Sequence, residues 1–136
     1  MTDIAFLPAR RLASLIRRRK VGCLELLDHY LDRVERFNPT LNAIISTDIP
    51  AARRRARAAE VSVARGEKLP PLYGVPMTVK ESFDVKGLAT SWGVSAHQNS
   101  VAIQDALSVR RLREAGAIIF GKTNIPTWLA DCQSAN

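Results

Sequence analysis

The chain has 136 residues, of which 46% are hydrophobic and 24% are charged, as is typical of one globular domain. These values exclude a disordered, collagen-like or disulfide-framework protein. Twenty Lys and Arg residues against thirteen Asp and Glu residues give a net charge of +7, but no aromatic residues are interleaved with the basic clusters. We therefore expect solvated helix faces rather than a nucleic-acid partner.

The first forty residues predict two amphipathic helices. Apolar residues recur at steps of three and four over residues 8–20 and 23–37, which places them on one face of each helix. The two helices are joined at Val21-Gly22. Asn38-Pro39 is expected to end the second helix, because the residue before a proline is disfavoured in the helical region.

A short extended segment is expected over residues 41–46, and a third helix is predicted to begin at Pro50. Proline is tolerated in the first turn of a helix, where its missing N–H would have no partner. Gly66 is expected to close this helix. A stripe of small side chains along it predicts close packing on a neighbour. The stripe consists of Ala52, Ala56, Ala59 and Val63.

The second half of the chain begins with a change to alternation. Val75, Met77 and Val79 alternate with other residues up to Lys80, which predicts a strand with one apolar face. The stretch 84–104 contains glycines and many hydroxyl residues and is predicted as a long irregular loop.

A helix and a second strand follow the loop. Asp105 is a candidate N-cap for a helix through Glu114, and Gly116 is its expected stop. Residues 117–120 are wholly apolar, which is typical of a strand covered on both faces. Residues 121–126 are expected to form a strand-to-helix turn before a short helix. Three side chains of the first helix are expected to face inward, namely Leu107, Val109 and Leu112.

This order of elements predicts an α/β fold. Helices over residues 1–69 pack on a partial mixed or parallel sheet, and residues 70–136 supply a strand–helix–strand crossover. The longest apolar run is far too short to span a bilayer, and the N-terminus lacks the basic-then-apolar order of a secretory signal. Because Cys23 and Cys132 are two lone thiols far apart in sequence, we expect a reducing compartment, the cytoplasm.

Two lysines fall at the ends of predicted strands, where open parallel sheets bind ligands. Lys80 follows an apolar strand and precedes the long loop, so we expect its ammonium group to be held away from bulk water. Desolvation favours the neutral form of a lysine and would make it a base. The alternative is a solvated or ion-paired lysine. Lys122 occupies the corresponding place after residues 117–120.

Other chemistry is not indicated. His29, His97 and the two cysteines lack metal-ligand spacing, so neither a metal nor a cofactor is expected. Residues 116–123 match the letters of a phosphate-binding loop, GxxxxGKT. The four middle residues are typical of a strand, however, whereas that loop requires the strand to precede the first glycine. A phosphate-binding loop is therefore not predicted.

Longer motifs resemble the amidase signature family over nearly the whole chain. The sequence PLYGVPMTVKE at residues 71–81 is similar to the family's "PLxGVPxxVKD". Residues 105–124 resemble "DAxxVxRLRxAGAxxxGKTN", and residues 38–43 resemble an "NPxLNA" turn after the N-terminal helices, with Leu31 in register. Each motif is weak alone, but their order and spacing together are specific.

The resemblance implies a fold and a mechanism. Lys80 corresponds to the lysine of a Ser–cisSer–Lys triad, in which the lysine accepts a proton through a bridging serine and a second serine attacks the amide carbonyl. The short helix after the "GKTN" turn lines the acyl pocket in relatives, so Trp128, Leu129 and Ala130 are candidate substrate-binding residues, with ordinary core packing as the alternative. Ser134 lies elsewhere in the family pattern and is not the expected nucleophile.

The family's Gly- and Ser-rich segment, with both serines and the oxyanion hole, is expected after residues 131–136. We therefore predict that residues 1–136 are the N-terminal part of one amidase domain and are inactive alone. An unpaired sheet edge would favour self-association or docking to the remainder of the domain. The expected function is hydrolysis of linear carbon–nitrogen bonds in a small-molecule amide, without a membrane. The alternatives are the role of the A-subunit in a glutamyl-tRNA amidotransferase and a truncated, non-catalytic binding module.

Overall fold

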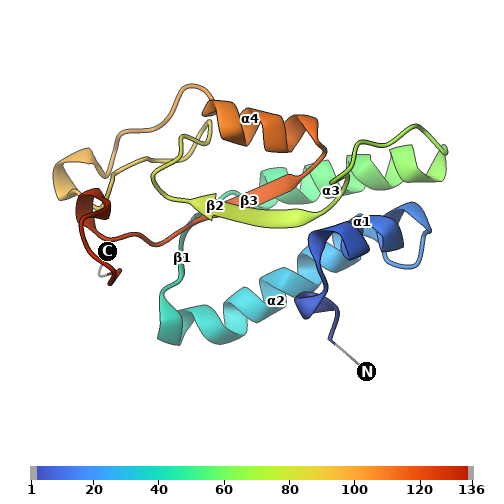
Figure 1. The fold of residues 1–136 in the computed structure, drawn as a ribbon, viewed down its shortest axis with the longest axis horizontal. Coiled ribbons are helices and arrows are strands. Elements are labelled where there is room, and N and C mark those ends of the chain that lie inside the picture. The colour runs from blue at the N-terminus through green and yellow to red at the C-terminus, as the bar shows by residue number, and fades with distance from the viewer. Residues whose placement is uncertain (1–2, 135–136) are drawn as a thin grey trace.

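The computed structural model describes residues 3–134, so residues 1–2 and 135–136 of the predicted domain lie outside the described residues. Figure 1 shows a sheet with α1 and α2 on one side and α4 on the other. No helix within residues 3–134 is long and apolar enough to cross a membrane. The helices are α1 (Ala9–Arg17), α2 (Cys23–Leu41), α3 (Ile49–Ala64) and α4 (Leu107–Glu114), and the strands are β1 (Ile44–Thr47), β2 (Pro76–Lys80) and β3 (Ile118–Thr123).

The three strands form one mixed sheet in the order β1–β3–β2. The central strand β3 runs antiparallel to β1 and parallel to β2. The chain passes from β2 to β3 through α4, which is the predicted strand–helix–strand crossover. The α/β class with a partial mixed sheet is therefore confirmed, and β2 is an edge strand among the described residues.

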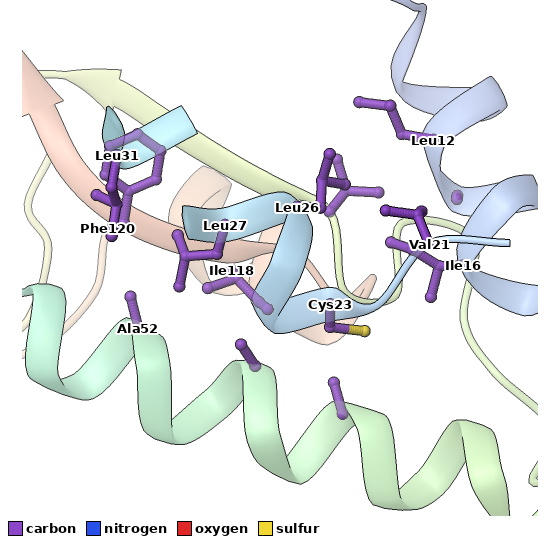
Figure 2. Packing of buried hydrophobic residues seen from close by; sticks show 14 residues of the cluster. Leu12, Ile16, Val21, Cys23, Leu26, Leu27, Leu31, Ala52, Ile118 and Phe120 are labelled. Atoms are coloured by element: carbon purple, nitrogen blue, oxygen red, sulfur yellow. The ribbon is translucent and has the colours of Figure 1, made fainter. Parts of the chain in front are cut away.

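The apolar side chains of β3 pack on both faces of the sheet, as the run of apolar residues predicted. Ile118 and Phe120 belong to the core that α1, α2 and α3 cover. Ile119 belongs to a second cluster with Val109 of α4. Figure 2 shows the first core, in which Leu27 of α2 lies close to Ile118 and the α3 helix passes beside them. The stripe of small side chains on α3 allows this helix to pack closely against the core. Its residues Ala52, Ala56 and Ala59 are buried.

Helix α2 continues past the predicted end at Asn38-Pro39 and includes Pro39 in its last turns. Three hydrogen bonds stabilise this ending. The Asn38 side chain accepts a hydrogen bond from the Ile44 N–H and donates one to the Ile44 carbonyl, both at 2.8 Å. Asn42 adopts a left-handed conformation and its N–H donates to the Asn38 carbonyl at 2.7 Å. Asparagine is one of the residues that adopt this left-handed cap. The cap stabilises the last turns of α2, although a residue before proline disfavours the helical conformation.

The start of α4 also differs from the prediction. Asp105 is not the N-cap, because the helix begins at Leu107 and Ala106 occupies the cap position. The Asp105 carboxylate instead accepts the Lys86 N–H at 2.8 Å and pairs with Arg113 at 2.8 Å. Leu107, expected to face inward, is 51% exposed, whereas Val109 is buried. Tertiary pairing of Asp105 thus takes precedence over local capping.

The predicted turn over residues 121–126 begins later than expected. Gly121, Lys122 and Thr123 belong to β3 because β1 and β2 pair with them on both sides. The chain then forms a single 3-10 turn, Thr127–Leu129, in place of the predicted short helix. The extension of β3 moves Lys122 from a turn into the centre of the sheet.

The two cysteines are both free and differ in burial. Burial raises the pKa of the Cys23 thiol to about 11, and the nearby charge of Glu60 adds to this shift. Cys132 is exposed. Only about one Cys23 thiol in a thousand is then ionised at pH 8. We expect a disulfide reagent at pH 8 to label one thiol per chain rapidly and the second only after unfolding, with Cys23 labelling faster as the pH rises.

The matched measurement uses a Cys132→Ser chain. It is expected to show no rapid labelling in the folded state and full labelling in denaturant. Rapid labelling of the folded Cys132→Ser chain at pH 8 would contradict the burial of Cys23.

Candidate active site

The two candidate lysines lie at the carboxyl ends of the neighbouring parallel strands. Lys80 ends β2 and is paired with Thr123 of β3, while Lys122 is paired with Val79. Lys80, which was expected to be kept from water, is exposed, whereas Lys122 is fully buried. The prediction that Lys80 is kept from water is therefore wrong for the described chain. Residues 89 and 90 of the loop after β2 cover Lys122, whereas Lys80 ends the edge strand β2 and stays exposed.

Lys122 is held by the long loop that follows β2. Its ammonium group donates hydrogen bonds to the Ala89 carbonyl at 2.5 Å and to the Thr90 hydroxyl at 2.9 Å. Burial lowers the pKa of Lys122, and the carboxylates of Glu81 and Asp84 partly oppose this shift. Hydrogen bonds to these two acceptors, rather than contact with solvent, therefore stabilise the buried ammonium group of Lys122.

Glu81 is the second buried charged residue at this end of the sheet, with an exposed fraction of 2%. Its carboxylate accepts the N–H of Trp92 at 3.1 Å and the N–H of Ser91. We did not single out this residue from the sequence. The sequence did contain a signal for its burial. Glu81 follows Val79 by two residues, so it falls on the face of β2 that the apolar residues occupy.

The loop over residues 84–104 is more ordered than predicted. It folds back on itself through an isolated antiparallel bridge between Ala89 and Val101. The Thr90 N–H donates to the Ser100 carbonyl at 2.9 Å, and the Gly87 N–H donates to the Ala102 carbonyl at 2.9 Å. These bonds place residues 89–92 beside the ends of β2 and β3, where Glu81 and Lys122 bind them.

The residues predicted to line an acyl pocket lie at the same end of the sheet but are not packed in a core. Trp128 is 56% exposed and Leu129 is 37% exposed, and Ala130 is also exposed. The Trp128 ring contacts Trp92, with ring centroids 6.1 Å apart, and the ring of His97 at 5.8 Å. The alternative of ordinary core packing therefore does not hold for the described residues.

The three aromatic rings line an open hollow of about 490 Å³ between the two loops that follow β2 and β3. Trp92, His97 and Trp128 form its aromatic part, and Asp84 and Thr90 are among its polar residues. Lys80 does not line this hollow. The structure thus brings Trp128 together with the loop that Lys122 holds, and leaves Lys80 on the neighbouring strand.

A larger and mostly apolar groove of about 660 Å³ runs between α2 and β2. Residues 76–78 of β2 line one wall, and Tyr30, Val34 and Phe37 of α2 line the other. Lys80 follows Thr78 by two residues and therefore lies on the same face of β2. The groove accordingly leads towards the end of the strand at which Lys80 stands.

Among residues 3–134, no three His, Cys, Asp or Glu side chains lie together in a way that could hold a metal ion. His29 pairs instead with Asp3 at 3.2 Å, and His97 contacts Trp128. The polar chemistry at the strand ends is thus that of two lysines and one buried carboxylate.

A lysine at the end of a parallel strand, followed by a loop over the strand ends, defines an α/β protein with a candidate acid–base site. Comparisons with known proteins identify the family. The profile of the family described as Amidase matches residues 25–136. The chain belongs to the amidase family.

Individual relatives agree with this assignment. The chain is 41% identical over 125 residues to AmiB2 of Mycobacterium tuberculosis (strain ATCC 25618 / H37Rv), named as an amidase, covering 92% of this chain and 27% of that protein. It is 33% identical to the A-subunit of the glutamyl-tRNA(Gln) amidotransferase of Acidothermus cellulolyticus, covering 100% of this chain and 27% of that protein.

A solved structure shows the same fold. The peptide amidase of Stenotrophomonas maltophilia superposes with a TM-score of 0.83 at 31% identity, covering 91% of this chain and 26% of the enzyme. The chain thus spans about a quarter of the length of the relatives that it matches.

Proposed function

We propose that this chain supplies the base Lys80 to an amidase that hydrolyses linear carbon–nitrogen bonds through a Ser–cisSer–Lys triad. The observation that carries the proposal is the position of Lys80. It lies inside the stretch that matches the amidase family, and it ends a parallel strand beside β3. Parallel sheets bind ligands at this end of their strands.

In the proposed reaction, neutral Lys80 takes a proton through a bridging serine while a second serine attacks the amide carbonyl. The tetrahedral intermediate collapses, the C–N bond breaks, and the proton leaves with ammonia or an amine. Water then attacks the acyl-enzyme and releases the acid. Both serines belong to the family segment expected after residue 136, so this chain alone is proposed to be inactive.

The exposed Lys80 needs a cover for this chemistry, since a catalytic site works when it is closed to bulk water. The unpaired edge of β2 and the apolar groove between α2 and β2 offer a surface for such a cover. We propose that further polypeptide packs here, either the remainder of an amidase domain or a second copy. Its apolar side chains would exclude bulk water from the lysine.

We further propose Trp128, Leu129 and Ala130 as one wall of the substrate site. Their exposure leaves them free to contact a ligand, and the Trp128 ring stands beside the open hollow. The substrate is proposed to be a small-molecule amide, and no cofactor or membrane is required. A cytoplasmic location is proposed because both cysteines are free.

The experiment compares two proteins. The 136-residue chain alone is expected to release no ammonia from a peptide amide. A chimera in which this chain replaces the matched segment of the Stenotrophomonas maltophilia peptide amidase is expected to release it. The chimera supplies the serines and the covering polypeptide. A chimera that unfolds cooperatively but has no activity, or turnover by the isolated chain, would contradict the proposal.

The second candidate is the role of the A-subunit in a glutamyl-tRNA amidotransferase. It is favoured by the match of the whole chain to one such protein and by the net charge of +7. Binding of tRNA that weakens steeply between 50 and 200 mM salt, at about the slope of several phosphate contacts, would support it. A non-catalytic binding module remains the third candidate, and salt-sensitive RNA binding by an inactive chimera would favour it.

A further inference from the structure

Two charged side chains that the proposed reaction does not use are almost completely buried at the ends of β2 and β3. Lys122 has no exposed surface and Glu81 is 2% exposed. Burying a charge is expensive unless it is hydrogen-bonded. Each of the two charges is satisfied by groups of one short segment, residues 89–92. Lys122 binds the Ala89 carbonyl and the Thr90 hydroxyl, and Glu81 binds the Ser91 and Trp92 N–H groups.

The geometry of these contacts is that of a clamp. The cation lies on the central strand and the anion directly follows the edge strand, so the segment 89–92 is held from both strands at once. The segment thereby spans the carboxyl ends of the parallel pair. The two opposite charges also attract each other electrostatically, which adds to the hold on the segment between them.

The backbone on both sides of Lys80 is bonded to β3, the strand that carries Lys122. Val79, before it, is paired with Lys122. Glu81, after it, donates its N–H to the Thr123 carbonyl at 3.1 Å. The Phe83 N–H then donates to the Lys80 carbonyl at 3.0 Å. The exposed side chain of Lys80 therefore stands between Val79, whose backbone pairs with that of Lys122, and Glu81, whose buried carboxylate binds residues 91 and 92.

We infer that Glu81 and Lys122 are positioning residues for the amidase reaction, which hold residues 89–92 across the strand ends and thereby fix the place of Lys80. Neither touches the reacting atoms. This inference rests on the proposed function for the role of Lys80. Its structural part, the hold of Glu81 and Lys122 on residues 89–92, concerns only this chain. It is measured separately from the catalytic part, the effect on the amidase reaction.

The structural part is measured in the 136-residue chain. In Glu81→Gln, we expect amide exchange at Ser91 and Trp92 to accelerate by at least about tenfold, because their charge-assisted hydrogen bonds to the carboxylate are weakened. Lys122→Met removes the bonds to Ala89 and Thr90 of the same segment and is expected to accelerate the same amides. Exchange at Ile119, in the centre of β3, serves as the reference for global unfolding. The matched controls are Glu67→Gln and Lys68→Met, which change exposed residues.

A spectroscopic signal reports on Lys80 directly. Reductive methylation with ¹³C-formaldehyde is expected to label exposed Lys80 in the folded chain and to leave buried Lys122 unlabelled. The dimethylamine resonance of Lys80 is expected to shift in Glu81→Gln and to stay in place in Glu67→Gln. An unchanged Lys80 resonance in a variant whose Ser91 and Trp92 exchange faster would overturn the inference, as would unchanged exchange.

The catalytic part is measured in the chimera. Glu81→Gln and Lys122→Met are expected to lower kcat by about tenfold or more with little change in KM, since a misplaced base costs transition-state stabilisation. Lys122→Arg retains the charge and is expected to recover part of kcat. Equal losses in Lys122→Arg and Lys122→Met would overturn the positioning role. If Lys80→Met leaves the chimera active while both clamp variants loosen residues 89–92, the proposed function fails but the clamp stands.

Discussion

Replacing Lys80 by methionine in the active chimera is expected to lower kcat/KM by about 10²–10⁴-fold, the usual contribution of a positioned general base. Methionine has a similar length and lacks a group that can accept a proton. The loss is expected mainly in kcat, because the proposed role of Lys80 concerns proton transfer rather than substrate binding. The measurement is the rate of ammonia release over a range of peptide amide concentrations.

The control for this prediction is Lys86→Met, which removes another exposed lysine from the loop after β2. It is expected to leave the rate unchanged. Because Lys80 is exposed at the end of an edge strand, Lys80→Met is also expected to leave the thermal transition of the 136-residue chain nearly unchanged. A Lys80→Met chimera with near-normal kcat would remove Lys80 from the mechanism.

The same residue shows where sequence reasoning was sufficient and where it was not. Alternation of apolar residues before Lys80 predicted the strand and the end at which the lysine stands. Periodicity cannot tell an edge strand from a central one, however, because that distinction depends on which other segments pair with it. Nor does periodicity show which lysine a loop will cover: residues 89 and 90 of the loop after β2 bind Lys122, whereas Lys80 ends the edge strand and is exposed.

Single-residue preferences failed where a side-chain contact outside the predicted element outweighed them. Pro39 predicted a helix end, but Asn38 bonds to Ile44 and allows α2 to continue. Asp105 has a good capping side chain, but its carboxylate pairs with Arg113 from the next turns of the chain. In both cases the competing contact joins a residue of one predicted element to a residue six or eight positions further on, and the preference of the single residue for a cap or a helix end does not include that contact.

Gly116 differs from these two cases, because the helix end that it predicts from sequence agrees with its packing in the fold. It ends α4 with φ of +92°, and its N–H and that of Ala117 donate to the carbonyls of Arg113 and Leu112. This pattern is a Schellman cap, which favours glycine. The same turn packs against Tyr73, and a Cβ at Gly116 would lie 2.7 Å from the Tyr73 Cα.

Gly116→Ala is therefore expected to destabilise the chain by about 3 kcal/mol or more, which combines left-handed strain with a clash against backbone. The shift in Tm is expected to be about 10 °C. The clash also bears on the sheet, because the N–H groups of Leu72 and Gly74 donate to the carbonyls of Ala115 and Gly116 at 2.8 and 2.9 Å. These bonds align the start of β2 with the start of β3, and so place Lys80 and Lys122 side by side at the other end.

The matched control is Gly66→Ala at the end of α3. Gly66 also has a positive φ, +68°, and forms the same cap, with its N–H and that of Glu67 donating to Val63 and Ser62. No atom lies within 4 Å of the Cβ that alanine would add there. Gly66→Ala is therefore expected to cost about 1 kcal/mol, from backbone strain alone. The effect of alanine on the unfolded chain is common to both variants, so their difference isolates the contact with Tyr73. Equal losses of stability in denaturant unfolding would mean that Tyr73 moves aside freely, and that the alignment of β2 with β3 does not depend on this contact.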